Sequence, residues 1–262
     1  MYAQPTRHEV LDTPVDALDM SAALEYVAQA VEVRTSPGFV LAVNPEKIYA
    51  LRADAELRNF FSQAYMLLPD GIGVVKALRF LYHVKIGRVP GADLMQNICK
   101  EAPMRGYKLF LLGASEDVNR NAVEILRERY PGINIVGRHN GFIDAAEMPG
   151  LVKQINDSEA NILFVAMGSP AQELWMQTYC PQLAGVKICQ GVGGTFDVIT
   201  GHVKRAPEGW QKCNLEWFYR LLHQPTRAKR QLKLIRFVAD VAKQKVTMKS
   251  VPNGTNDSRT TG

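Results

Sequence analysis

The chain has 262 residues, of which 47% are hydrophobic and 22% are charged, and its 31 Lys or Arg against 26 Asp or Glu give a formal net charge of +5. These proportions are typical of an ordinary globular protein of one large or two modest domains, and they exclude collagen-like, low-complexity and wholly disordered chains. The four cysteines form no CxxC pair and no Cys/His cluster with the spacing of zinc ligands, so we expect reduced thiols, no structural zinc and a cytoplasmic location.

No segment has the composition of a signal peptide or a membrane span. The first sixteen residues carry acids and prolines in place of an apolar core, so we expect no export. One of the two longest runs without a charged residue lies between Glu173 and Lys187, and it is interrupted by Gln and Pro. It is shorter than the roughly 20 apolar residues that cross a bilayer.

Short apolar runs alternate with segments of helical spacing through the first 200 residues. The expected strands are 39–43, 66–68, 107–112, 133–136, 162–167 and 186–189. The expected helices are 21–33, 45–53, 92–102, 116–130, 145–155 and 171–179, with an apolar helix after residue 71. This alternation predicts an α/β fold with a mostly parallel, Rossmann-like sheet and helices on both faces.

Polar or glycine-rich turns follow five of the expected strands. Ligands of open parallel sheets bind beyond the carboxyl ends of the strands, so we expect these turns to form the rim of one site. The turns are 44–45, 69–71, 113–115, 168–170 and 191–194.

Several rim residues have two interpretations each. Asp70 is either the N-cap of the following helix or a general base. Arg88, in the loop 87–93, either binds a phosphate or pairs with a surface acid. The segment 168–173 is either an anion- or sugar-binding helix start or an ordinary turn.

The glycine-rich segments match no nucleotide fingerprint. Segment 191–197 could let the backbone approach a nucleotide, but Phe196 occupies the place of the third glycine of GxGxxG. The segment from Gly71 fails in the same way at Lys76, and no P-loop occurs. The five histidines are scattered and neither HExxH nor GxSxG is present, so metal sites and serine-hydrolase triads have no support.

The positive charge is concentrated near the C-terminus. Residues 203–249 hold twelve Lys or Arg against three Asp or Glu, with Trp210, Trp217, Phe218 and Tyr219 among them. This composition favours contact with an anionic surface, such as lipid, phosphate or nucleic acid, over a merely solvated helical face. We therefore expect an α/β body over residues 1–200, a basic helical appendage over 201–246, with helices at 208–222 and from 226 to about 245, and a disordered tail over 247–262.

Seven segments resemble the WecG/TagA/CpsF bacterial glycosyltransferases in the same order along the chain. They are FVLAVNPEK (39–47), LLPDGIGVV (67–75), GRVPGADL (87–94), FLLGAS (110–115), VAMGSPAQE (165–173), GVGGTFDVITGHVKRAP (191–207) and LEWFYRLLHQPTRAKRQLKL (215–234). The last two resemble the WecG branch most closely.

The resemblance implies a metal-independent, inverting enzyme without a cofactor. It implies transfer of a sugar from a UDP-sugar to a polyprenyl-diphosphate-linked acceptor at the inner face of the cytoplasmic membrane, for an exopolysaccharide or another surface glycan. Self-association through the body is also implied. Membrane docking of the appendage would couple acceptor capture to completion of the site, and deletion of residues 203–262 would test this.

The resemblance also assigns roles to individual residues. Asp70 corresponds to the general base, and Asn44 to a strand-end residue that positions the acceptor. Arg88 and Gln172 match substrate-binding residues, and we assign Asp93, Gly191 and Gly194 to substrate binding as well. The arginines that match those neutralising the UDP diphosphate are Arg220, Arg227 and Arg230.

The chain departs from one branch of this family at one position, and one alternative to an enzyme remains. The teichoic-acid branch has Thr where this chain has Ala42, which favours the WecG-like or exopolysaccharide members, with glucose, N-acetylmannosamine or N-acetylmannosaminuronic acid as the donor sugar. The alternative is a non-enzymatic α/β module that binds anionic membrane or nucleic acid through its basic C-terminus. We expect no nucleic-acid partner, because no recognised nucleic-acid motif is present.

Overall fold

The six apolar runs expected to be strands form one parallel sheet. The computed structural model describes residues 5–204, 206–207, 209–210 and 228–250. In spatial order the strands are β4 (Met66–Pro69), β3 (Gly38–Val43), β8 (Ile188–Gly191), β7 (Ile162–Ala166), β5 (Lys108–Gly113) and β6 (Asn134–His139). All neighbours in this sheet pair in parallel, so the predicted strands and sheet type are confirmed.

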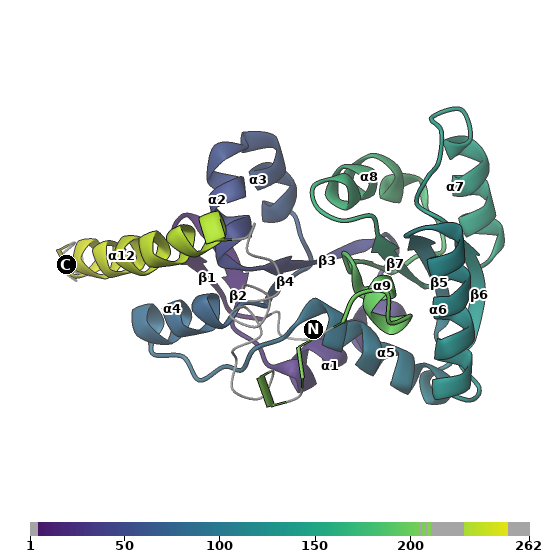
Figure 1. The fold of residues 1–262 in the computed structure, drawn as a ribbon, viewed down its shortest axis with the longest axis horizontal. Coiled ribbons are helices and arrows are strands. Elements are labelled where there is room, and N and C mark those ends of the chain that lie inside the picture. The colour runs from purple at the N-terminus through teal and green to yellow at the C-terminus, as the bar shows by residue number, and fades with distance from the viewer. Residues whose placement is uncertain (1–4, 205, 208, 211–227, 251–262) are drawn as a thin grey trace, which may run out of the picture.

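Helices cover both faces of this sheet (Figure 1). One face packs against α2 (Pro45–Ala53), α3 (Ala55–Ser62), α4 (Ile72–Tyr82), α7 (Met148–Asp157) and α8 (Ala171–Tyr179). The other face packs against α1 (Met20–Val33), α5 (Gly91–Arg105), α6 (Glu116–Arg129) and α9 (Thr195–Ile199). Outside the first of these layers, α12 (Ala228–Ser250) packs on α4 and α2. Alternate strand residues, such as Leu111 and Leu112, enter opposite cores, which explains why the strands are apolar runs.

A hairpin that the sequence did not predict precedes the sheet. It consists of β1 (Arg7–Val10) and β2 (Thr13–Asp16), which pair antiparallel. Asp16 is fully buried and accepts hydrogen bonds from Arg7 Nε at 2.7 Å and from Leu67 N at 2.8 Å. This carboxylate therefore ties the hairpin to β4. The short helices α3 and α9 were not predicted either.

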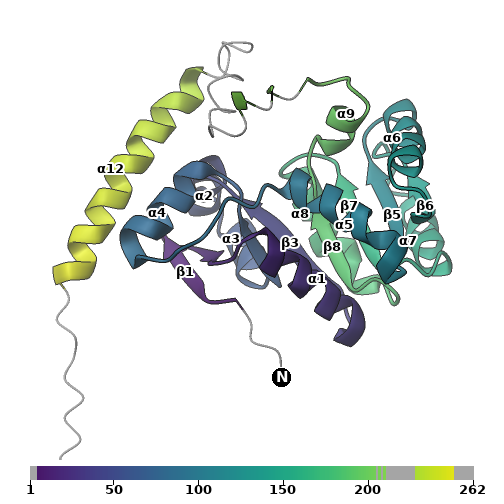
Figure 2. The same ribbon diagram turned by 90° about the horizontal axis from the view of Figure 1, so that it is seen from below.

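The C-terminal helix α12 packs into the core of the body. It lies alongside α4 and α2 (Figure 2). Phe237 is only 2% exposed and Val241 is also buried, both in the cluster that contains residues of α2 and α4. Farther along the helix, Gln244 hydrogen-bonds both to Leu11 N and to Glu9 O of the hairpin. The division of the chain at residue 200 stays a prediction, and the structure adds that α12 runs to Ser250 and contributes to the body's core.

Other C-terminal predictions lie outside the described residues. These include nearly all of the predicted helix 208–222, the arginines Arg220 and Arg227, and residues 251–262 of the predicted tail 247–262. Residues 247–250 of that tail belong to α12, so the prediction of disorder is wrong for them. Arg230 lies on α12, but its side chain is outside the description. Within the described parts of the chain, no helix is both long enough and apolar enough to cross a membrane.

Candidate active site

The five predicted turns lie along one edge of the sheet. Because every strand of the sheet points the same way, the carboxyl ends of the strands share this edge. Along the edge the turns follow one another in the order 69–71, 44–45, 191–194, 168–170 and 113–115. The chain leaves β3 toward the face covered by α2 and leaves β8 toward the face covered by α9. Such a divergence between neighbouring strands opens the crevice in which α/β proteins bind ligands.

Asp70 is not the cap of the helix that follows it. α4 begins at Ile72, its N-cap is Gly71, and no side chain of the described residues caps the helix with a hydrogen bond. The backbone N–H of Asp70 donates to Val43 O at 3.1 Å, which joins this turn to the end of β3. A Cβ on Gly71 would lie 3.1 Å from Asn44 Cβ, so the two turns are in close contact. Of the two interpretations of Asp70, capping is therefore excluded.

Arg88 lies against the Asp70 turn. Its Nε donates to Asp70 O at 2.5 Å, and the N–H of Val89 donates to Pro69 O at 3.1 Å. The loop leads directly into α5, whose first residue, Gly91, faces Ala42 at the end of β3. Asp93 lies in the first turn of the same helix.

Asn44 is the N-cap of α2. Its Oδ1 accepts a hydrogen bond from Lys47 N at 2.9 Å, and Pro45 occupies the first helical turn. Capping uses the oxygen of the amide, so the Nδ2 group is oriented away from the helix backbone. Nδ2 makes no hydrogen bond to the described residues. Asn44 therefore presents a donor at the carboxyl end of β3.

Gln172 links the turns after β7 and β8. The side chain is buried, and its Oε1 accepts from Gly193 N at 2.9 Å. A Cβ on Gly191 would lie 2.7 Å from Gln172 Nε2, so only glycine permits this approach without displacing the amide. Gly194 is exposed on the same loop. The structure thus brings Gln172 together with Gly191, one of the two predicted glycines.

Two buried polar features of the edge were not predicted. Lys47 Nζ forms an ion pair with Glu173 Oε1 at 2.7 Å, between the first turns of α2 and α8. Gln190, in β8, donates from Nε2 to Gly91 O at 2.8 Å and so holds the start of α5 over the sheet. Gln190 directly follows the expected strand 186–189, so its position could be read from the sequence, whereas the ion pair joins residues 126 positions apart.

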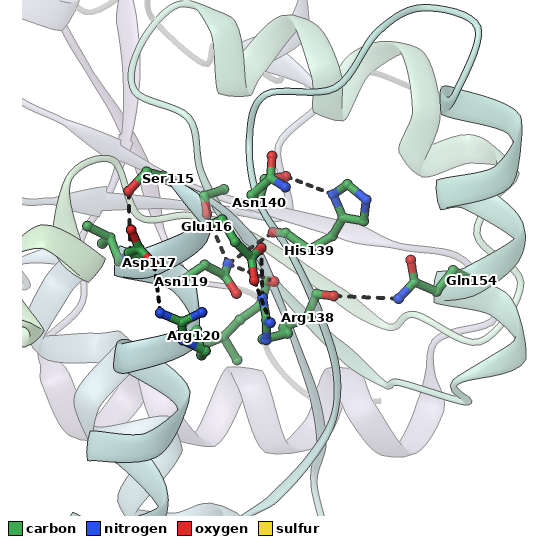
Figure 3. A network of polar contacts seen from close by, with 12 residues as sticks. Ser115, Glu116, Asp117, Asn119, Arg120, Arg138, His139, Asn140 and Gln154 are labelled. Carbon is green, nitrogen blue, oxygen red and sulfur yellow. Dashed lines mark hydrogen bonds and ion pairs between the residues drawn. The ribbon is translucent and has the colours of Figure 1, made fainter.

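The outer end of the edge is held by a polar network (Figure 3). The buried Asn119 Nδ2 donates to Gly113 O and to His139 O, each at 2.9 Å, which ties the ends of β5 and β6 together. Arg138 pairs with both carboxylate oxygens of Glu116, and these bonds hold the pKa of that carboxyl below its ordinary value. The turn after β5 is therefore joined by hydrogen bonds to the end of β6.

Metal ligands of the described residues do not gather at this edge. Across the described ranges, no group of three or more His, Cys, Asp or Glu side chains is arranged to hold a metal ion. The charged groups near the Asp70 and Asn44 turns include the carboxylate of Asp70, the guanidinium of Arg88 and the Lys47–Glu173 pair. Independence of metal stays a prediction.

Comparison with known protein families identifies the family of this chain. The model of the Glycosyl transferase WecG/TagA/CpsF family matches residues 8–251, which run from the hairpin through α12. The resemblance stated from the seven sequence segments is thereby confirmed at the level of the family. Enzymes of this family transfer sugars, which decides against a non-enzymatic binding module.

Proposed function

Because the chain belongs to the WecG/TagA/CpsF family of glycosyltransferases, we propose that it transfers a sugar from a UDP-sugar to a polyprenyl-diphosphate-linked acceptor with inversion at the anomeric carbon. The product is a lipid-linked intermediate of a bacterial exopolysaccharide or another surface glycan. The observation that carries this proposal is the position of Asp70, a carboxylate at the sheet edge that does not cap its helix.

In this mechanism Asp70 is the general base. It accepts the proton of the acceptor hydroxyl, whose oxygen attacks the anomeric carbon from the side opposite UDP. The bond between that carbon and the diphosphate oxygen breaks, and UDP leaves with its electron pair. No covalent enzyme intermediate forms, so one base suffices. Asn44, whose turn contacts Gly71, donates from Nδ2 to orient the acceptor.

The departing diphosphate needs positive charge or hydrogen-bond donors. Arg88 and the N-terminus of the 15-residue helix α5 lie beside the Asp70 turn, and α5 has no side-chain cap. Both features favour an anion there. We propose that they act together with Arg220, Arg227 and Arg230 in place of a metal ion.

The donor sugar is a neutral hexose or N-acetylhexosamine in this proposal. A uronate would need a cation beside the sugar. Lys47 is a cation close to Asn44, but Glu173 already neutralises it at 2.7 Å. This pairing favours glucose or N-acetylmannosamine over N-acetylmannosaminuronic acid.

The acceptor is a lipid, so the enzyme works at the membrane in this proposal. The face of α12 that points away from α4 carries Ile235, Val238 and Val246, all well exposed, beside the exposed Arg236 and Lys243. Apolar residues next to basic ones on one helix are typical of contact with an anionic bilayer surface. We propose that this face rests on the inner leaflet of the cytoplasmic membrane.

Sugar transfer to a synthetic polyprenyl-diphosphate-linked acceptor tests the function. The donors are UDP-glucose, UDP-N-acetylmannosamine and UDP-N-acetylmannosaminuronic acid, each in EDTA. We expect transfer from one neutral donor, and a kcat roughly 10²- to 10⁴-fold lower in Asp70→Asn because general-base catalysis is worth about that factor. Asp157→Asn, an exposed carboxylate on α7, is the matched control and is expected to leave kcat unchanged. Full activity of Asp70→Asn would refute the assignment of the base.

A further inference from the structure

An ion pair that this mechanism does not use lies among the turns of the site. Lys47 Nζ and Glu173 Oε1 are 2.7 Å apart, and the two side chains are only 10% and 3% exposed. Lys47 also contacts Ser169 Oγ and lies over the ring of Phe61. Glu173 Oε2 has no hydrogen-bond partner among the described residues. The pair links α2, which follows β3, with α8, which follows β7.

Polar contacts extend from this pair in both directions. On one side, Lys47 N donates to Asn44 Oδ1 at 2.9 Å. On the other side, Gln172 Nε2 lies 3.5 Å from Glu173 Oε1, and Gln172 Oε1 accepts from Gly193 N at 2.9 Å. Since β8 lies between β3 and β7, this chain of contacts crosses the end of β8 and joins three neighbouring turns.

Stability alone does not account for a buried ion pair. Removing two charges from water costs about as much as their attraction returns, and an apolar pair of similar volume is often as stable or more so. Charge-assisted hydrogen bonds do fix geometry, because they are short and strong. Here the geometry in question is the separation between Asn44 and Gln172.

We propose that the Lys47–Glu173 pair is a positioning device for sugar transfer. It holds Asn44 and Gln172 at their working separation and, through Gln172, sets the backbone of the loop 191–194. Neither residue of the pair contacts a reacting atom. This inference rests on the proposed function, because the effect of the pair is expected on donor binding and turnover.

Three variants separate positioning from stability: Lys47→Met, Glu173→Gln and the two combined. Each single variant leaves one buried charge without its partner, so Tm and transfer both fall. The double variant removes both charges, and we expect its Tm to return close to that of the wild type. Its kcat/KM for the donor is expected to stay roughly 10- to 100-fold low, with a raised donor KM, because small misplacements of binding groups have effects of this size.

Hydrogen exchange at the Gly193 amide makes the test independent of any substrate. We expect faster exchange in the double variant, because Gln172 no longer holds that N–H. Unchanged exchange, or a wild-type kcat/KM in the double variant, would overturn the positioning role. Absence of transfer by the wild-type enzyme would count against the proposed function only.

The matched control is a second lysine–glutamate pair. Lys108 Nζ and Glu159 Oε2 are 2.6 Å apart. Lys108 is the first residue of β5, so it lies at the amino ends of the strands, away from the candidate site. The combined variant Lys108→Met and Glu159→Gln is expected to change neither Gly193 exchange nor kcat/KM.

Discussion

Replacing Phe237 by Ala is expected to release α12 from the body. Phe237 is 2% exposed, and its Cε1 lies 3.6 Å from the position that a Cβ on Gly73 would occupy. Truncating a buried Phe to Ala costs about 3–5 kcal/mol. If α12 opens on its own, this loss raises the equilibrium constant for opening by roughly two to three and a half powers of ten.

Hydrogen exchange with peptide resolution measures this opening directly. Exchange of the α12 amides near Phe237 is expected to accelerate by the factor above, while amides of β5 and β7 at the centre of the sheet change little. Ile235→Ala is the matched control, because Ile235 lies on the same helix but is 71% exposed. Equal acceleration in both variants would refute the conclusion that Phe237 anchors α12, as would no acceleration in Phe237→Ala.

Two further predictions concern the glycine loop and the α2–α12 contact. Gly191→Ala places a Cβ 2.7 Å from Gln172 Nε2. We therefore expect kcat/KM for the donor to fall at least about tenfold in the sugar-transfer assay. The control is Gly150→Ala, where the new Cβ lies in open space, and we expect it to leave kcat/KM unchanged. Burial and the hydrogen bond to Asp240 raise the pKa of Tyr49 to about 12 from 10.0. Because the pKa is higher in the folded protein, the protonated hydroxyl of Tyr49 stabilises the fold fully below pH 10, and this stabilisation is lost as the pH rises through 12. We therefore expect the difference in urea midpoint between wild type and Tyr49→Phe to shrink over that range.

The sheet was predictable because its strands are buried on both faces. A parallel strand between two layers of helices is apolar at most positions, and Ile162–Ala166 shows this with five buried residues in succession. Each such run is short and ends in a glycine or polar turn, so sequence alone located the edge where Asp70 and Asn44 meet. The hairpin has no such run, because Arg7, Glu9 and Asp16 interrupt it and its anchor is the distant Leu67 N.

Within the site, the sequence showed residue types but not partners. Lys47 and Glu173 both lie inside segments that carry the family resemblance, yet their pairing depends on the order of β3, β8 and β7 in the sheet. The role of Asp70 was equally open, because a carboxylate before a helix caps it in many proteins. Only the position of the first helical residue, Ile72, separates the two interpretations.

The position of α12 also changes how membrane docking should be tested. Deleting residues 203–262 would remove Phe237 and Val241 from the core, and Leu234 from its contact near Gly73, which is three residues after Asp70. Lost activity in such a deletion would therefore report a damaged body as readily as a lost membrane contact. Ile235 and Val238 point away from that core. Polar substitutions at these two positions separate the two causes, because they alter the exposed face of α12 and leave its packing on α4 intact.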